Sequence, residues 1–135
     1  MGAFAPRAIT RAASWADGLA GFSLGPDPGE IERGFRAARD AWRAAERGSP
    51  PQLVTSFWYA LGPRAREQLD AYVARYLGIF GKAAVAGAQR AAVAAGPQAV
   101  RDALRAIESA GGDETILVPT SAGLDQLDRL RDLIG

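Results

Sequence analysis

The side chains able to do chemistry in this sequence are few in kind. The 135 residues include neither cysteine nor histidine. A thiol nucleophile, a Cys/His zinc site and a Ser-His-Asp triad within one chain are therefore excluded. Carboxylates, hydroxyls, many arginines and a single lysine, Lys82, remain. The sequence predicts no metal site and leaves the catalytic residues unknown.

Two hydroxyl residues, Thr120 and Ser121, stand where a strand would give way to a helix. The first amide groups of a helix can hold a phosphate, so this pair is a candidate anion site. Hydroxyls at such positions more often cap the helix, and the pattern favours that interpretation.

The aromatic run Phe57-Trp58-Tyr59 could stack on a flat ring. Successive strand residues point to opposite faces, so Phe57 and Tyr59 share one side and Trp58 takes the other. We expect at least one of these sides to belong to the core.

Composition narrows the classes of partner and location. Sixteen Lys and Arg against 15 Asp and Glu give a net charge of +1, which predicts no nucleic-acid partner. No apolar run reaches the roughly 18 residues of a membrane span, which predicts no membrane partner. The first 13 residues lack the pattern of a signal peptide, so a cytoplasmic protein is expected. The length fits one domain, residues 1–135, without an internal linker.

The helix with the clearest signals is expected from Pro28 to Arg47. Asp27 is placed as its N-cap, Pro28 at the first helical position and Glu30 at the third, as in a capping box. Apolar residues behind them recur at steps of four and three, which makes one stripe for the core. Trp42 lies on that stripe and is expected to be buried.

Strands and helices alternate along the rest of the chain. Residues 53–59 form the best strand pattern, being rich in β-branched and aromatic types with large or apolar groups on both faces. Such a strand suits a buried parallel sheet, and the alternation predicts an α/β fold with a parallel sheet. Further strands are expected at 19–24 and 115–119, with part of a fourth at 1–4, and further helices at 6–16, 63–77, 82–95, 97–110 and 122–134, the last with Leu124, Leu127, Leu130 and Ile134 inside.

Several of these segments together resemble the luciferase-like flavin-dependent monooxygenase family, which includes deazaflavin-dependent oxidoreductases. The similar stretches are Gly2-Ala3-Phe4-Ala5-Pro6, Trp15-Ala16-Asp17-Gly18-Leu19, the Ala41-Trp42-Arg43-Ala44-Ala45 helix end, Thr115-Ile116-Leu117-Val118-Pro119-Thr120 and Leu124-Asp125-Gln126-Leu127. The resemblance covers nearly all of this chain but only the C-terminal half of the family's barrel.

This resemblance implies half of a TIM (β/α)8 barrel, with about four parallel strands, the first one clipped, and flanking helices. It implies oxidoreductase or monooxygenase chemistry with FMN or a deazaflavin. Sites in such barrels lie at the carboxyl ends of the strands. The implied cofactor-binding residues are Gly2, Ala3, Ser23, Tyr59, Thr120 and Ser121. The family half that in many members carries a catalytic histidine has no counterpart here.

A half-barrel sheet has unpaired edges and an apolar face that the other half would cover. We therefore expect a homodimer or a higher homo-oligomer, a truncated oxidoreductase that self-associates and retains weak flavin binding. Two alternatives stay open. One is a non-catalytic scaffold that self-associates; the other is a subunit completed by a separate chain carrying the N-terminal half.

Overall fold

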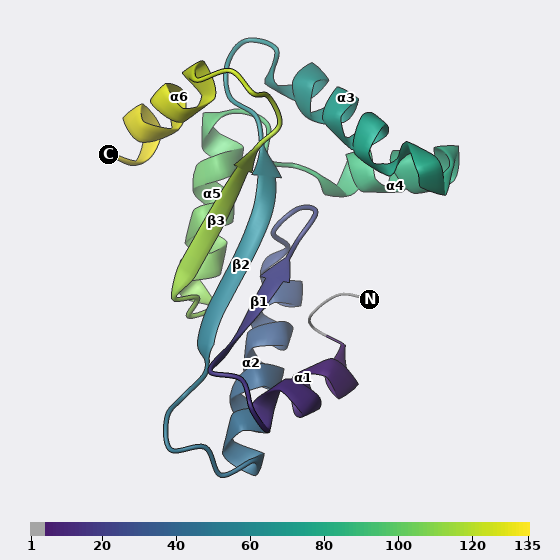
Figure 1. Cartoon of the computed structure of the whole chain (residues 1–135). Helices are drawn as coiled ribbons and strands as arrows, with labels where there is room; N and C mark the ends of the chain where they lie inside the picture. The colour runs from purple at the N-terminus through teal and green to yellow at the C-terminus, as the bar shows by residue number, and fades with distance from the viewer. Residues whose placement is uncertain (1–4) are drawn as a thin grey trace.

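The computed structural model describes residues 5–135, which form three strands flanked by helices (Figure 1). Its elements, in chain order, are α1 (Pro6–Ala13), β1 (Gly18–Phe22), α2 (Pro28–Ala44), β2 (Gln52–Tyr59), α3 (Ala65–Leu77), the 3-10 turn η1 (Gly78–Phe80), α4 (Lys82–Ala91), α5 (Pro97–Ser109), β3 (Glu114–Pro119) and α6 (Asp125–Ile134).

The three strands form one parallel sheet in the order β1-β2-β3. Leu19 is in register with Leu53, and Phe57 with Leu117. The predicted α/β fold with a parallel sheet is therefore confirmed. The partial strand expected at residues 1–4 lies outside the described residues.

Helix α2 shows how local signals set an element. The Asp27 side chain accepts a hydrogen bond from the Glu30 amide at 2.8 Å, as an N-cap should. The helix then buries Phe35 and Trp42, which are 0% and 2% exposed. Both the cap and the buried position of Trp42 agree with the prediction; the helix ends at Ala44, three residues earlier than expected.

One face of the sheet carries the larger of two clusters of buried residues. Leu53, Phe57 and Tyr59 of β2 point to this face and are at most 2% exposed. They pack in one cluster with residues of α2 and α5, which lie behind the sheet in Figure 1. We call this side the helix face. Burial of these large side chains supplies most of the stabilisation of the domain.

The opposite face of the sheet, here called the open face, is much less covered. Side chains two residues apart share a face, so Phe22, Val54 and Ile116 lie on it. Phe22 is 40% exposed and Ile116 49%. Large apolar side chains on both edge strands thus face solvent.

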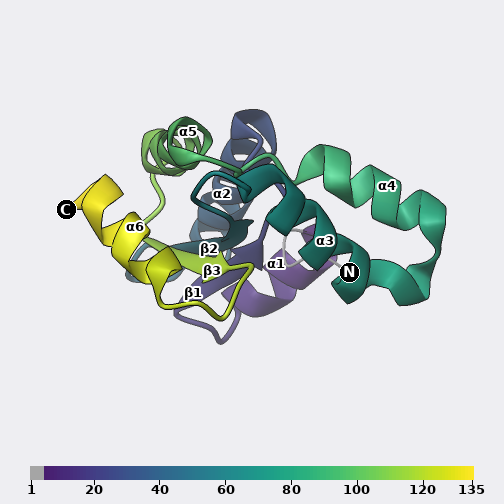
Figure 2. The ribbon, with the colours of Figure 1, turned by 90° about the horizontal axis from the view of Figure 1, so that it is seen from above.

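Helices α3 and α4 form a hairpin that projects from the carboxyl end of β2 to one side, while α6 leaves on the other (Figure 2). Gly81 joins the two with a φ of 91°, a backbone conformation that glycine adopts without strain. The helix predicted to run to Ala95 stops at Ala91. The next residues run beside β2 instead, where the Ala60 amide donates to Ala94 O and the Gly96 amide donates to Ala60 O.

Helix α6 departs most from its prediction. Of its expected inward residues, Leu124, Leu127 and Ile134 are 75%, 53% and 58% exposed. Gln126 is buried instead, because its amide donates to Leu61 O and accepts from Leu61 N, both at 2.9 Å. This pair of bonds turns the helix so that Leu130 and Leu133 meet the core.

No helix within residues 5–135 has the length and hydropathy to cross a membrane.

Candidate functional site

A pocket of about 470 Å³ opens on the open face at the carboxyl ends of the strands. Each strand contributes its last open-face residues, and α3 closes one side. We call it the aromatic pocket; its lining is Phe22, Leu24, Trp58, Tyr72, Tyr76, Leu77 and Val118.

Trp58 is the centre of this pocket. Its ring lies edge-on to Phe22 at 4.8 Å, and edge-on to Tyr72 and Tyr76 at 5.2 and 5.1 Å between centroids. Such edge-to-face contacts are favourable because the positive ring edge meets the negative ring face. Trp58 itself is 5% exposed, whereas Tyr76 is 61% exposed. The cluster therefore has a fixed base and accessible outer rings.

Hydrogen bonds hold α3 over the strand ends. The Gln68 amide donates to Thr120 Oγ1 at 3.1 Å, and that hydroxyl donates to Tyr59 O at 3.0 Å. Farther along the hairpin, Arg66 donates to Ala92 O and Gln89 donates to Asp70 O. These bonds join α3 to β2, β3 and α4, so the tyrosines are positioned by a braced helix.

Pocket electrostatics are simple. None of the lining residues is charged. Arg75 lies outside the lining with its guanidinium carbon 5.8 Å from the centre of the Tyr72 ring, within range of a cation–π contact. On the helix face, burial followed by the nearby Asp125 charge raises the pKa of Tyr59 above its ordinary 10.0. Tyr59 is thus neutral at physiological pH.

The cofactor residues predicted from sequence do not gather in this pocket. Ser23 is buried and its hydroxyl donates to Gly25 O at 2.8 Å. Tyr59 is 0% exposed on the helix face, where its hydroxyl donates to Gln126 O at 3.3 Å. Thr120 is buried and bonded as described above. Gly2 and Ala3 lie outside the described residues.

The expected capping of the last helix by Thr120 or Ser121 is wrong. α6 begins at Asp125, and its N-cap residue Leu124 makes no side-chain cap bond. The Ser121 hydroxyl instead accepts from the Gly123 amide at 3.2 Å. The turn formed by residues 121–124 therefore separates both hydroxyls from the helix end.

Sequence reasoning placed Trp58 and Tyr59 on opposite faces but did not say which face would be open. The sequence predicted the helix that carries Tyr72 and Tyr76 but not their part in a site, and it gave no role to Gln68 or Gln126. The four-residue step between the two tyrosines was a usable signal, because it places two rings on one helix face. No local signal marks the glutamines, whose partners lie 52 and 65 residues away.

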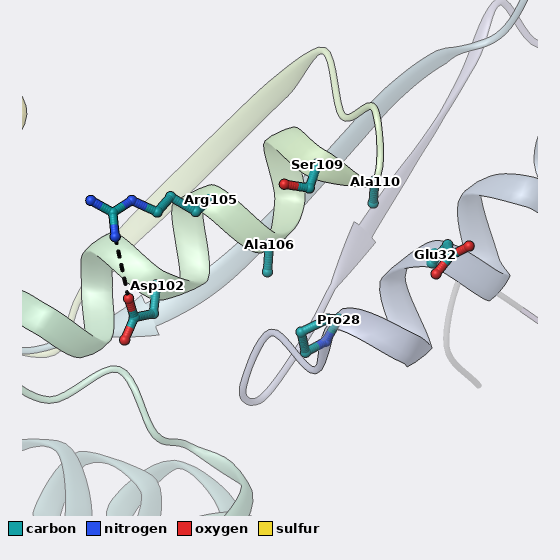
Figure 3. A pocket seen from close by; sticks show the side chains of 7 residues that line it. All are labelled: Pro28, Glu32, Asp102, Arg105, Ala106, Ser109 and Ala110. Carbon is teal, nitrogen blue, oxygen red and sulfur yellow. Dashed lines mark ion pairs between the residues drawn. The ribbon is translucent and has the colours of Figure 1, made fainter.

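A second pocket, of about 360 Å³, lies between α2 and α5 on the helix side of the sheet (Figure 3). Its charged residues already have partners: Asp102 faces Arg105 at 3.8 Å and Glu32 pairs with Arg36. Its lining comes from the two helices and the residues at their ends, without a strand residue, and Ser109 is its one uncharged polar side chain. Within residues 5–135 no group of three acidic side chains is arranged to hold a metal ion. The aromatic pocket is therefore the better candidate site.

Comparisons with known proteins find the same fold in larger enzymes. An F420-dependent secondary alcohol dehydrogenase, solved with an F420-acetone adduct, superposes with a TM-score of 0.72 at 14% identity, over 96% of this chain and 45% of that chain. Monooxygenase RslO1 from Streptomyces bottropensis superposes with a TM-score of 0.61 at 23% identity, over 97% of this chain and 44% of that chain. The coenzyme F420 dependent tetrahydromethanopterin reductase from Methanopyrus kandleri superposes with a TM-score of 0.62 at 16% identity, over 98% of this chain and 47% of that chain. No family model and no curated protein matches the sequence.

The fold is luciferase-like. These structural neighbours are luciferase-like enzymes, and the chain spans under half the length of each, so its three parallel strands and flanking helices are half of a TIM barrel. The resemblance noted in the sequence is confirmed at the level of the fold. In luciferase-like barrels, as in other TIM barrels, active sites lie at the carboxyl ends of the strands. The aromatic pocket occupies that place.

Proposed function

We propose that this half-barrel is part of an oxidoreductase that works with a deazaflavin or a flavin, and that its chemistry takes place at the aromatic pocket. The observation that carries the proposal is the position of this pocket at the carboxyl ends of parallel strands. Two neighbours of the same fold are F420-dependent enzymes by name, which favours a deazaflavin over FMN.

The aromatic pocket fits the ring system of such a cofactor better than its charged tail. A flat, largely apolar ring matches walls made of Trp58, Phe22 and Val118. A phosphate needs free donors, and the hydroxyls of Ser23 and Thr120 already donate to backbone carbonyls. Among the described residues proposed for the cofactor, Ser121 is the one at a partly exposed turn beside the strand ends.

The bound cofactor would supply hydride or oxygen-linked redox chemistry. The residues of this chain would position the ring and exclude water from it. Trp58 provides a fixed apolar floor, and α3 provides a wall braced by the Gln68–Thr120 bond. The cytoplasmic location expected from the sequence stays a prediction.

The proposal is tested by titrating the protein with F420 and, separately, with FMN while following cofactor fluorescence. We expect saturable quenching by the wild-type chain and by Trp15→Leu, a control at a residue 72% exposed and outside the pocket. We expect weaker binding by Trp58→Leu, with circular dichroism checking that this variant folds. Absence of saturable quenching with either cofactor at tens of micromolar would overturn the proposal.

We further propose that copies of this chain self-associate through the open face as a homodimer or a higher homo-oligomer. The support is the exposed Ile116 on that face, together with the outer edges of β1 and β3, which pair with no strand of the described residues. Two half-barrels facing each other would cover both features. A non-catalytic scaffold would share this assembly without binding cofactor, so the titration above separates the two functions.

Sedimentation velocity over a range of concentrations tests self-association. We expect a dimer or larger species for the wild type and dissociation for Ile116→Asp, since the substitution places a charge on the apolar surface proposed as the interface. Asp132→Ala, at an exposed position of α6, is the control and should leave the assembly unchanged. A folded wild-type monomer at all concentrations contradicts self-association and favours completion by a separate N-terminal-half chain.

A further inference from the structure

The lining of the aromatic pocket also indicates the class of substrate. We infer that it selects an uncharged, flat aromatic ring, held by the two tyrosines of α3. The inference rests on the proposed function, because it names the substrate class of the same site.

Charge is the first part of the argument. No lining residue carries a charge, and the polar side-chain atoms of the lining are the hydroxyls of Tyr72 and Tyr76 and the indole N–H of Trp58. A carboxylate entering the pocket would lose water without gaining an opposite charge from the lining. A neutral ligand bearing one hydroxyl or carbonyl would lose little, since a tyrosine hydroxyl can both donate and accept a hydrogen bond.

Ring geometry is the second part. Tyr72 and Tyr76 are stacked, with centroids 5.9 Å apart and an interplanar angle of 14°, and both lie edge-on to Trp58. Tyr76 keeps 61% of its surface exposed and Phe22, on the other side of Trp58, keeps 40%. Accessible aromatic surface therefore flanks a buried indole, an arrangement in which a further flat ring gains edge-to-face or offset contacts. A saturated ring gains only apolar contact from the same surface.

Rigidity is the third part. The Gln68–Thr120 bond and the Arg66 bond to Ala92 O fix α3 at both its strand end and its α4 side. The helix that carries the tyrosines is consequently held in place before a ligand arrives, and both rings contact the buried Trp58. Such preorganisation favours one ligand shape over others, because little ordering is left for binding to cost.

The test compares three bicyclic probes by titration calorimetry: 2-naphthol, which is neutral and flat; 2-naphthoate, which is flat and charged; and decahydro-2-naphthol, which is neutral and saturated. We expect 2-naphthol to bind about tenfold more tightly than either of the others. Equal affinity for the charged or the saturated probe would overturn the inference.

Variants locate the binding. Tyr76→Ala should weaken 2-naphthol binding about 2- to 12-fold, the range expected for one aromatic contact, while Tyr76→Phe should keep it. The matched control is Ile79→Ala on the same hairpin, 84% exposed and outside the lining, which should have no effect. An unchanged affinity in Tyr76→Ala, or an equal loss in Ile79→Ala, contradicts the assignment.

A competition experiment separates this inference from the proposed function. Saturating F420 should leave the 2-naphthol affinity within about twofold, because substrate and cofactor rings must be bound together; displacement would assign the tyrosine wall to the cofactor and overturn the inference. Selective naphthol binding without any cofactor binding refutes the proposed function alone. Cofactor binding without selectivity among the probes refutes this inference alone.

Discussion

The two faces of the three-stranded sheet share the same backbone yet have opposite environments. On the helix face, Phe57 and Tyr59 are fully buried against α2 and α5. On the open face, Ile116 and Phe22 keep about half and two fifths of their surface in solvent. Both faces include large apolar side chains, so the presence of such residues alone does not explain the difference. The helix face is an internal core, whereas the open face is the one on which we propose that a ligand and a second copy bind.

The largest expected effect compares a core residue with an open-face residue. Phe57→Ala should lower the free energy of unfolding by about 3–5 kcal/mol, because it leaves a cavity in the helix-face core. Ile116→Ala should cost about 1 kcal/mol in the dissociated protein, since its side chain is half exposed. Urea denaturation at low protein concentration measures both. Equal losses would mean that the open face is as well packed as the core.

A second comparison concerns the two glutamines that join helices to the strand ends. Gln126→Leu leaves the backbone amide and carbonyl of Leu61 without hydrogen-bond partners. We therefore expect the free energy of unfolding to fall by about 2–4 kcal/mol. Gln68→Leu, on the open-face side, removes one bond to Thr120 and should cost about 0.5–1.5 kcal/mol. The same denaturation experiment ranks the two, and a larger loss from Gln68→Leu would reverse the comparison.

The helix face also contains one buried hydroxyl group without a hydrogen-bond partner among the described residues. Thr55 is 0% exposed, and its hydroxyl has no hydrogen-bond partner among the described residues. Thr55→Val keeps the shape and removes the unsatisfied hydroxyl, so we expect a gain in stability of about 1 kcal/mol. Thermal unfolding would show a raised midpoint. A lowered midpoint would indicate that the hydroxyl has a partner in the folded protein.

The smallest effect is a pH dependence confined to the helix face. Burial and the Asp125 charge raise the pKa of Tyr59, so the unfolded chain releases this proton at a lower pH than the folded chain. The resulting stabilisation is complete below pH 10 and declines as the pH rises from 10 towards the folded-state value. Unfolding free energies measured from pH 8 upward should fall less steeply in Tyr59→Phe than in the wild type. Identical slopes would contradict the assignment.

The helices and strands with strong local signals were predictable. The Asp27 cap, the stripe of α2 and the strand predicted at 53–59 all follow from residue types at short spacing, and the structure has each of them. Predictions that depended on long-range partners did worse. Leu124 and Leu127 had the spacing of a core stripe but are exposed, because two bonds between Gln126 and Leu61 set the rotation of α6.

The candidate site divides in the same way. The sequence marked Trp58 and Tyr59 as ring residues on opposite faces, since strand residues alternate, but both faces of this strand are apolar and pattern alone does not rank them. The structure puts Tyr59 in the core and Trp58 in the aromatic pocket, where Tyr72 and Tyr76 join it from α3.

By itself, then, the sequence determined which segments are helices and strands, that the strands are parallel, and that they resemble half of a luciferase-like barrel. Each of these follows from residues close together along the chain or from the order of elements. Only the tertiary structure decided which face of β2 is the core and which is the site. That choice depends on where α2, α5 and α3 come to lie, and it is fixed by contacts between residues far apart in the chain.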